Sequence, residues 1–457
     1  MHSTAPRRTP AREPYPLFGH ERADAIIAWR GAEPVTAGRF LAEVMHAAKA
    51  LPEAGHMLNL CADRYRFALA LCAAVVRGQV TLMPPAATPH AIAAMRAFAP
   101  DAYCIADDAT PGLGLPRFDL PAGSAPDIAF DVPRIPGDQV VACLFTSGST
   151  GEPQPYPKRW ASLVADVAGE ARRLGIGPGH AILGTVPPQH MYGFESTVML
   201  PLVSGAALTA DRPFLPAEID AAVERVPAPR TLFITPFHLR AWVESGECVR
   251  VETVVSATAP LSQELARRTE AVAAGRLIEI YGSTETGQVA TRETARTSEW
   301  HALEGIRIRT EGDRAWASGA HIDEPTPLND VIEVLGDGAR FLLHGRTADM
   351  VNVAGRRNSI GYLNHQLNSI EGVEDAAFFL PDAAAGDGVT RLMAFAVAPG
   401  LEAAAILASL RQRIDPAFLP RPLVLVERLP RQLTGKLTRE SLQALARAHG
   451  NANPRRP

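Results

Sequence analysis

The stretch "VVACLFTSGSTGEPQPYPK" at residues 140–158 decides how this chain folds. It begins as an apolar strand, and hydroxyl and glycine residues follow at the strand's carboxyl end. In open α/β sheets ligands bind beyond the carboxyl ends of strands, and glycines let backbone N–H groups turn toward an anion. Taken alone, a Ser/Gly/Thr cluster is more often a linker than a phosphate site. The rest of the chain has to decide between the two.

Strand and helix signals alternate on both sides of this stretch. Before it, strands predicted at residues 56–60 and 79–83 flank an apolar helix predicted at residues 64–78. After it the alternation continues through residues 162–175 (helix), 180–186, 231–236 and 252–258 (strands), 263–275 (helix) and 277–282 (strand). This rhythm predicts an α/β fold with a largely parallel sheet.

The predicted pattern of secondary structure changes after about residue 290. Residues 306–319 and 331–345 predict antiparallel strands joined by glycine-containing turns. The tail then alternates short helices and strands, which is enough for a small α+β domain. We predict a large N-terminal α/β domain at residues 15–346, with parallel sheets and a β-barrel-like part, and a C-terminal α+β domain at residues 347–445.

Composition excludes several classes of protein. The chain has 457 residues, of which 47% are hydrophobic and 21% charged, and its net charge of -4 gives no reason to expect nucleic acid as a partner. The five cysteines form no CxxC pair, so buried thiols in a cytoplasmic protein are favoured over a disulfide or zinc framework. The longest apolar run, at residues 68–76, is too short for a membrane span, and the basic N-terminus lacks the apolar segment of a signal peptide.

Further motifs follow downstream in a fixed order. "EIYGSTETGQ" at residues 279–288 again ends an apolar strand, Asp330 precedes the pair Gly345–Arg346, and Lys436 lies in "LPRQLTGKLTRESL". The Walker and GxGxxG patterns are absent, which argues against an unrelated phosphate-binding α/β enzyme. Each fragment is modest evidence, and their joint occurrence is strong.

In this order the motifs resemble those of the adenylate-forming superfamily, which includes acyl- and aryl-CoA synthetases, the adenylation domains of peptide synthetases, and luciferases. The resemblance extends from about residue 30 to residue 445. It implies that the chain adenylates a carboxylic acid with ATP and Mg²⁺, releases pyrophosphate and passes the acyl group to a thiol. It also implies that residues 15–346 form the AMP-binding core and that the C-terminal domain is mobile, rotating between the two half-reactions.

The resemblance assigns most of the nucleotide site. The opening loop would surround the β- and γ-phosphates through Thr146, Ser147, Gly148, Ser149, Thr150 and Gly151. Tyr281 and Gly282 would lie against adenine, Thr284 would bind the α-phosphate or the substrate carboxylate, and Glu285 would hold Mg²⁺. Asp330 would accept both ribose hydroxyls. The alternatives are that Tyr281 is a core tyrosine, that Glu285 is a solvated acid in a loop and that Asp330 is an aspartate in a turn.

Three further groups complete that site. Thr258 and Ala259 would flank the adenine, and Arg346 would reach the ribose or a phosphate. Lys436 matches the lysine that neutralises the carboxylate and the α-phosphate as they approach, and an exposed turn lysine is the alternative.

The substrate side is less defined by sequence. The resemblance makes His190, Tyr192, Phe194, Phe233 and Ser256 candidate contacts of the acid, although a structural histidine and apolar core are equally good interpretations of His190 and Phe233. A last pair, Arg356 and Arg357, would meet a phosphate of CoA or of a carrier protein's phosphopantetheine. Exposed arginines without a partner are as good an interpretation.

The chain departs from the family pattern at two places. The loop lysine of the family is replaced by Gln154, and a lysine arrives only at Lys158. Either the loop is longer and Lys158 reaches back to the γ-phosphate, or the lysine is dispensable and the hydroxyls of Ser147, Ser149 and Thr150 hold the phosphate without it. At the hinge between the domains, Ala348 stands where an acid is usual, and Asp349 follows it.

The resemblance leaves the substrate and acceptor open. The acid is aryl or a short to medium acyl chain, and the compact build is similar to bacterial ligases that load a hydroxybenzoate-type acid onto an acyl carrier protein for polyene or pigment synthesis. CoA is the other acceptor. A non-catalytic relative that binds nucleotide or acyl groups is the rival hypothesis, and the retention of Glu285, Asp330 and Lys436 argues against it.

Overall fold

The computed structural model describes most of the chain. The described residues are 13–84, 88–107, 114–121, 128–147, 153–246, 249–312, 314–346, 350–353, 356–381, 391–431 and 437–450.

A five-stranded sheet contains the opening stretch. Its order is β6 (Tyr103–Ala106), β4 (His56–Leu60), β5 (Val80–Met83), β8 (Val140–Ser147) and β9 (Pro153–Arg159), all parallel except the antiparallel edge strand β9. The helices of this part are α1 (Ala37–Ala50), α2 (Arg64–Val76) and α3 (Pro89–Phe98). Helix α2 is apolar on nearly every side and almost wholly buried, which the run at residues 68–76 predicts.

The segment that leads to Lys158 is a strand, β9, whereas a longer loop was one of the two explanations for the position of this lysine. Its sequence, PQPYPKR, places prolines at 153, 155 and 157, and each lies opposite an odd-numbered residue of β8. Opposed residues of an antiparallel pair alternate between hydrogen-bonded and non-bonded pairs. Prolines at every second position can therefore all occupy the non-bonded pairs, where no N–H group has to point toward β8. For this reason the edge strand tolerates all three.

An eleven-stranded sheet forms the centre of the molecule. Its order is β20 (Asp330–Leu335), β21 (Arg340–Arg346), β16 (Trp300–Ala302), β15 (Gly287–Arg292), β14 (Arg276–Ser283), β13 (Thr253–Ser256), β12 (Arg230–Ile234), β10 (Ala181–Gly184), β11 (Ala207–Thr209), β2 (Ile26–Arg30) and β3 (Glu33–Thr36). The strands from β14 to β2 are parallel, and antiparallel strands extend the sheet at both ends.

Helices cover both faces of the parallel part. Along β12, Leu232 and Ile234 join a core with α7 (Pro216–Glu224), α8 (Pro236–Glu244) and α9 (Gln263–Ala273). Phe233, between them, joins the opposite core with α4 (Trp160–Leu174) and the helical segment built from α5 (Met191–Phe194), a π-helix (Glu195–Met199) and α6 (Leu200–Ser204). The two-residue period of a strand thus divides one apolar run between two helical layers.

The remaining elements lie after β16 or at the start of the chain. A three-stranded antiparallel sheet comprises β17 (Arg307–Glu311), β18 (Arg314–Gly319) and β19 (Ile322–Leu328). The C-terminal elements are β22 (Met350–Val353), β23 (Arg356–Ser359), α10 (Ile360–Asn368), β24 (Asp375–Phe379), β25 (Met393–Val397), α11 (Ala403–Arg411), a 3₁₀ turn (Pro416–Phe418), β26 (Leu423–Leu425) and α12 (Arg439–Gly450). A short pair joins β1 (Tyr15–Pro16) to β7 (Arg134–Ile135).

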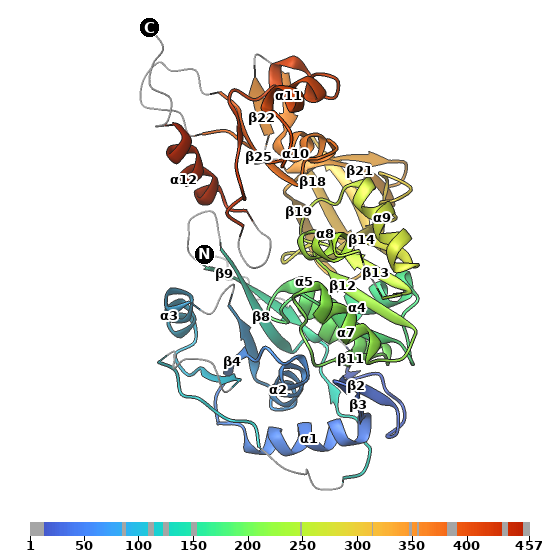
Figure 1. The fold of residues 1–457 in the computed structure, drawn as a ribbon. Coiled ribbons are helices and arrows are strands. Elements are labelled where there is room, and N and C mark those ends of the chain that lie inside the picture. Colours follow the sequence, from blue (N-terminus) through green and yellow to red (C-terminus); the bar gives the residue numbers. More distant parts are fainter. Residues whose placement is uncertain are drawn as a thin grey trace, which may run out of the picture.

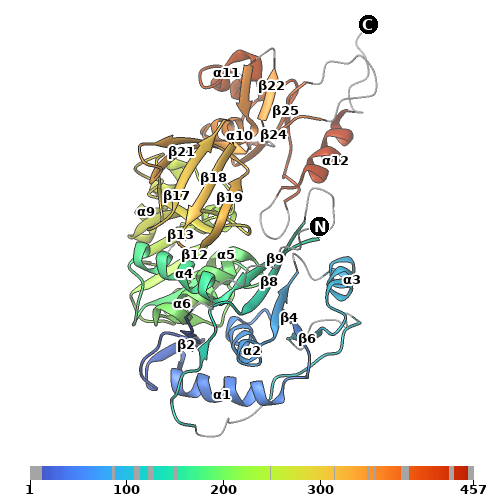
Figure 2. The ribbon, with the colours of Figure 1, turned by 180° about the vertical axis from the view of Figure 1, so that it is seen from behind.

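The arrangement confirms the predicted fold class. Figures 1 and 2 show the orange and red C-terminal elements at one end of the molecule and the blue helices α1 and α2 at the other. The C-terminal elements have apolar cores of their own, built from residues 351–446. The boundary at 346/347 remains a prediction, since residues 347–349, including Ala348 and Asp349, lie outside the described residues.

The described cysteines fit the sequence prediction of buried thiols. Cys61, Cys72, Cys104 and Cys143 are free and buried, and burial raises the pKa of Cys61 to about 12. Cys248 lies outside the described residues. Within the described part of the chain, every helix is too short or too polar to span a membrane.

Candidate active site

The motif YGSTETG forms a tight hairpin between β14 and β15. Residues 284–286 make the turn, and the hydroxyls of Ser283 and Thr286 lie 3.1 Å apart, each also accepting a hydrogen bond from the other residue's N–H. Gly287 closes the turn with a φ of 70°, and a Cβ atom there would lie 2.2 Å from Oδ2 of Asp166. The sequence therefore requires glycine at this position both for the left-handed backbone and for the close packing.

The hairpin presents Thr284 and Glu285 at the carboxyl end of the parallel strands. Thr284 is half-buried, and Glu285 is exposed at the tip. This is the edge at which open α/β sheets bind ligands, as the sequence predicts.

Tyr281 and Asp330 are brought together from two different strands. The Tyr281 hydroxyl donates to Oδ2 of Asp330 over 2.6 Å, and its ring packs against Trp300 and Phe341 with centroids 5.7 Å apart in each case. The pairing of β20 with β21 places Arg346 directly opposite Asp330. Three of the residues predicted for the nucleotide are thus adjacent, and Gly282 lies beside Tyr281 in β14.

The loop after β13 shows local backbone strain. Thr258 has a φ of 82°, which is uncommon for a β-branched residue, and both Thr258 and Ala259 are exposed. Such strain concentrates at functional sites, which is consistent with the predicted contact of this loop with adenine.

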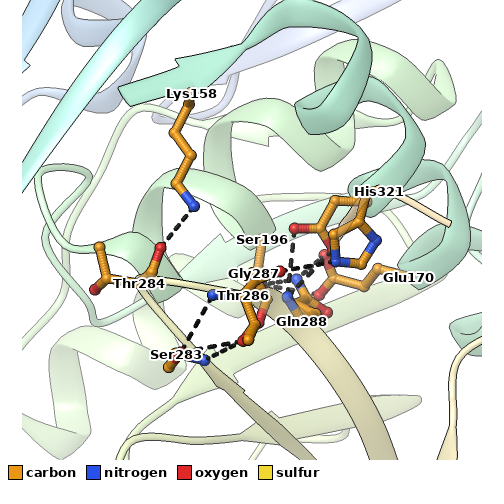
Figure 3. A network of polar contacts seen from close by, with 10 residues as sticks. Lys158, Glu170, Ser196, Ser283, Thr284, Thr286, Gly287, Gln288 and His321 are labelled. Carbon is orange, nitrogen blue, oxygen red and sulfur yellow. Dashed lines mark hydrogen bonds and ion pairs between the residues drawn. The ribbon is translucent and has the colours of Figure 1, made fainter. Parts of the chain in front are cut away.

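Strand β9 reaches the hairpin through two side chains. The Lys158 ammonium donates to the carbonyl oxygen of Thr284 over 2.6 Å (Figure 3). Two residues earlier, Tyr156 interacts with Glu285 and with Thr146, and its pKa is raised by burial first and by the Glu285 carboxylate second. Lys158 therefore lies against the Thr284–Glu285 turn in this structure.

A buried polar network, which the sequence analysis did not identify, lies beneath the hairpin. Ser196 donates to Glu170 over 2.8 Å, and the Gln288 amide lies 2.5 Å from the other Glu170 oxygen (Figure 3). Burial raises the pKa of Glu170 to about 8, against the opposing hydrogen bonds. Glu170 is therefore a neutral carboxyl group at pH 7.

A second pair of acids adjoins this network. Asp166 accepts the N–H of Gln288, and burial together with Asp166 raises the pKa of Glu195 well above its usual value. His321 lies 3.5 Å from Asp166 and 3.0 Å from the carbonyl oxygen of Thr286. The available sequence signal was the i,i+4 spacing of Asp166 and Glu170, which places both acids on one face of α4.

The substrate candidates divide into three environments. His190 is exposed at the N-terminus of α5, whereas Phe194 and Phe233 are fully buried in the core. Tyr192 donates to the carbonyl oxygen of Val255 over 2.8 Å, and the Oγ of the next residue, Ser256, is buried with no partner among the described residues. The structure thus brings Tyr192, Phe233 and Ser256 together at the end of β12 and β13.

Several predicted residues lie beyond what the structure describes. Gly148, Ser149, Thr150, Gly151 and Lys436 are outside the described residues. For others the backbone alone is described, and these are Ser147 at the end of β8, Arg346 in β21, and Arg356 and Arg357 in β23.

The described residues fit ATP and Mg²⁺ chemically. Asp330 offers carboxylate oxygens beside an aromatic ring, as a ribose and a base require, and Glu285 offers an exposed carboxylate. No group of three or more metal-binding side chains occurs among the described residues. A single carboxylate matches Mg²⁺, which takes one or two carboxylates together with substrate phosphates.

Comparisons with known proteins agree with this site. A family model of AMP-binding enzymes matches residues 41–362. The chain is 31% identical over 291 residues to a 4-coumarate–CoA ligase of Rhodobacter capsulatus, covering 63% of this chain and 71% of that protein. It is 27% identical over 352 residues to the p-hydroxybenzoic acid–AMP ligase FadD22 of Mycobacterium marinum. This match covers 67% of this chain and 49% of that protein. Among solved structures, ATP-bound MatB from Rhodopseudomonas palustris matches with a TM-score of 0.80 at 18% identity. This match covers 94% of this chain and 97% of that chain.

The fold and the hairpin define an enzyme of the adenylate-forming superfamily. The chain belongs to the AMP-binding enzyme family, and it is an acid–thiol ligase of the AMP-forming class.

Proposed function

We propose that this ligase adenylates an aromatic acid that carries a hydroxyl group, in the manner of a hydroxybenzoate, with ATP and Mg²⁺ as co-substrates. The acyl group then passes to the thiol of CoA or of a carrier protein's phosphopantetheine. The observation that carries the proposal is the hairpin, which presents Thr284 and Glu285 beside the Tyr281–Asp330 pair.

The chain's own residues have distinct proposed roles. Asp330 and Tyr281 position the nucleoside, and the Thr284 hydroxyl orients the carboxylate against the α-phosphate. Glu285 would hold Mg²⁺, which supplies charge neutralisation on the phosphates when it is bound. Lys436 stabilises the charge that develops as the carboxylate attacks, and Arg356 and Arg357 bind the phosphate of the thiol acceptor.

Unpartnered buried polar atoms favour an acid with a hydroxyl group. Tyr192 interacts with Glu170 on one side and bonds the strand of Ser256 on the other. The Oγ of Ser256 and the Oε1 of Gln288 are buried and unpartnered among the described residues. Because a buried polar atom without a partner costs about 1–3 kcal/mol, a hydroxyl that supplied one would be bound selectively.

The location proposed for this activity is the cytoplasm. The four described cysteines are free and buried, as in proteins of a reducing compartment.

The test is ATP–pyrophosphate exchange across benzoate, 3- and 4-hydroxybenzoate, 4-coumarate and octanoate. We expect the hydroxylated aryl acids to exceed benzoate by at least tenfold in kcat/KM. Exchange with octanoate alone would reject the aryl proposal, and exchange with no acid would reject the ligase role. The product mass after addition of CoA or of a holo carrier protein then identifies the acceptor.

A further inference from the structure

We propose that Lys158 is a positioning residue, which holds the Thr284–Glu285 turn in its reactive geometry and does not bind the ATP phosphates. The two activity measurements below rest on the proposed function, whereas the measurement of amide hydrogen exchange does not. The proposal explains how this chain dispenses with the usual loop lysine and why its lysine comes late.

The hairpin turn is held at three backbone groups by three different elements. Lys158 of β9 donates to the carbonyl of Thr284, and His321, between β18 and β19, contacts the carbonyl of Thr286. Asp166 of α4 accepts the N–H of Gln288. Lys158 is the contact nearest to the two reactive side chains, so its loss affects their orientation most directly.

The register of β9 directs two side chains to this turn. Tyr156 and Lys158 are two residues apart and therefore lie on one face of the strand. Both are half-buried, whereas the residues on either side of each are exposed. Tyr156 interacts with the Glu285 carboxylate, and Lys158 binds the preceding carbonyl. Strand β9 thus contacts both residues of the reactive pair, and it joins the five-stranded sheet to the eleven-stranded one.

The same register separates Lys158 from the position of the family's loop lysine. That position is Gln154, which pairs with Thr146 at the end of β8. At about 3.4 Å per residue, Lys158 lies about 14 Å further along the strand, which is more than a lysine side chain spans. Lys158 is therefore no positional replacement for the loop lysine.

Acidic side chains supply the countercharge for the ammonium. Lys158 lines a cavity of about 350 Å³ together with Asp166, Glu195 and Glu285. Its charge opposes the effect of burial on the pKa of Glu195. The ammonium thus donates to a carbonyl oxygen beside a cavity that the buried acids Asp166 and Glu195 also line.

The decisive experiment separates the two half-reactions in the full-length enzyme. Lys158→Met removes the ammonium and Lys158→Arg keeps a donor. Arg159→Met is the matched control, since Arg159 is exposed and donates to the carbonyl of Asp138. Pyrophosphate exchange reports adenylation, and thioester formation from synthetic acyl-adenylate reports a step without β- or γ-phosphates.

We expect Lys158→Met to lower kcat about tenfold or more in both half-reactions. The acyl and phosphate groups that Thr284 is proposed to orient are both present in the acyl-adenylate, and a hydrogen bond from a charged group to this turn is lost. Lys158→Arg should recover most of this, and Arg159→Met should match the wild type. A loss confined to pyrophosphate exchange, with a raised KM for ATP and normal thioester formation, would overturn the proposal in favour of direct phosphate binding.

Amide hydrogen exchange of residues 283–288 provides a test that needs no substrate. We expect faster exchange in Lys158→Met than in the wild type and in Arg159→Met, with most of the change reversed in Lys158→Arg. Unchanged exchange in Lys158→Met would refute the positioning role even if no acid proved to be a substrate.

Discussion

The neutral state of Glu170 gives the sharpest prediction for stability. Its carboxyl is completely buried, and burial raises its pKa from 4.5 to about 8. Between these pH values the unfolded chain has lost the proton that the folded protein keeps, so the free energy of unfolding falls as the pH rises. Integrated from pH 5 to pH 8, this single group lowers the stability by roughly 3–4 kcal/mol.

Glu170→Gln keeps the volume and the hydrogen-bonding capacity without the titration. The Gln288 amide nitrogen lies 2.5 Å from Oε2 of Glu170, and the amide oxygen introduced by the substitution can accept the same hydrogen bond. We therefore expect the stability of the variant, measured against wild type, to rise by roughly 3–4 kcal/mol between pH 5 and pH 8.

Urea denaturation at pH 5, 6, 7 and 8, followed by circular dichroism, measures this difference. Glu224→Gln, at an exposed carboxyl that ends α7, is the control for removing an acid from the same domain. A difference between Glu170→Gln and wild type that stays constant within about 1 kcal/mol would refute the reasoning, because it would show that folded Glu170 is ionised across this range.

Three further predictions follow from packing and hydrogen bonding. Gly287→Ala forces a Cβ against buried Asp166 from a left-handed backbone, and we expect a loss of about 2–5 kcal/mol in urea denaturation together with loss of pyrophosphate exchange. Arg64→Met removes a fully buried guanidinium that donates to four carbonyl oxygens and a hydroxyl, and calorimetry should show a loss of about 3–5 kcal/mol. Tyr281→Phe removes the hydroxyl bonded to Asp330, and we expect a several-fold higher KM for ATP with kcat for exchange little changed.

Local signals were sufficient for most of the fold. The run around Phe233 is apolar throughout, which is typical of a strand covered on both faces, and the structure places it in the centre of the parallel sheet. The hairpin at Tyr281 could be predicted as well, because hydroxyl residues and a glycine follow directly after an apolar strand. In both cases the information lies within ten neighbouring residues.

The contacts that hold the hairpin in place could not be predicted from local sequence in the same way. Gln288 bonds Glu170 across 118 residues, and His321 reaches Thr286 across 35, so neither contact leaves a local pattern. Strand β9 was obscured by its prolines, which suggest a loop unless their alternate spacing is noticed. Periodicity predicts which face of an element is buried, but it cannot predict which polar groups the fold will bury together.

The burial of these polar groups has a consequence for the charge at the reactive turn. Burial raises the pKa of Glu170 to about 8, and burial together with Asp166 raises the pKa of Glu195 well above its usual value, although the Lys158 ammonium opposes this second shift. The hairpin therefore lies over groups with little net charge, and the exposed Glu285 dominates the field at its tip. If the acids below it were ionised, they would compete with Glu285 for the Mg²⁺ that we propose it holds, and they would repel the carboxylate of the substrate. On the proposed assignment of Mg²⁺ to Glu285, burying these acids as neutral groups would favour the one carboxylate where the phosphates could share the cation.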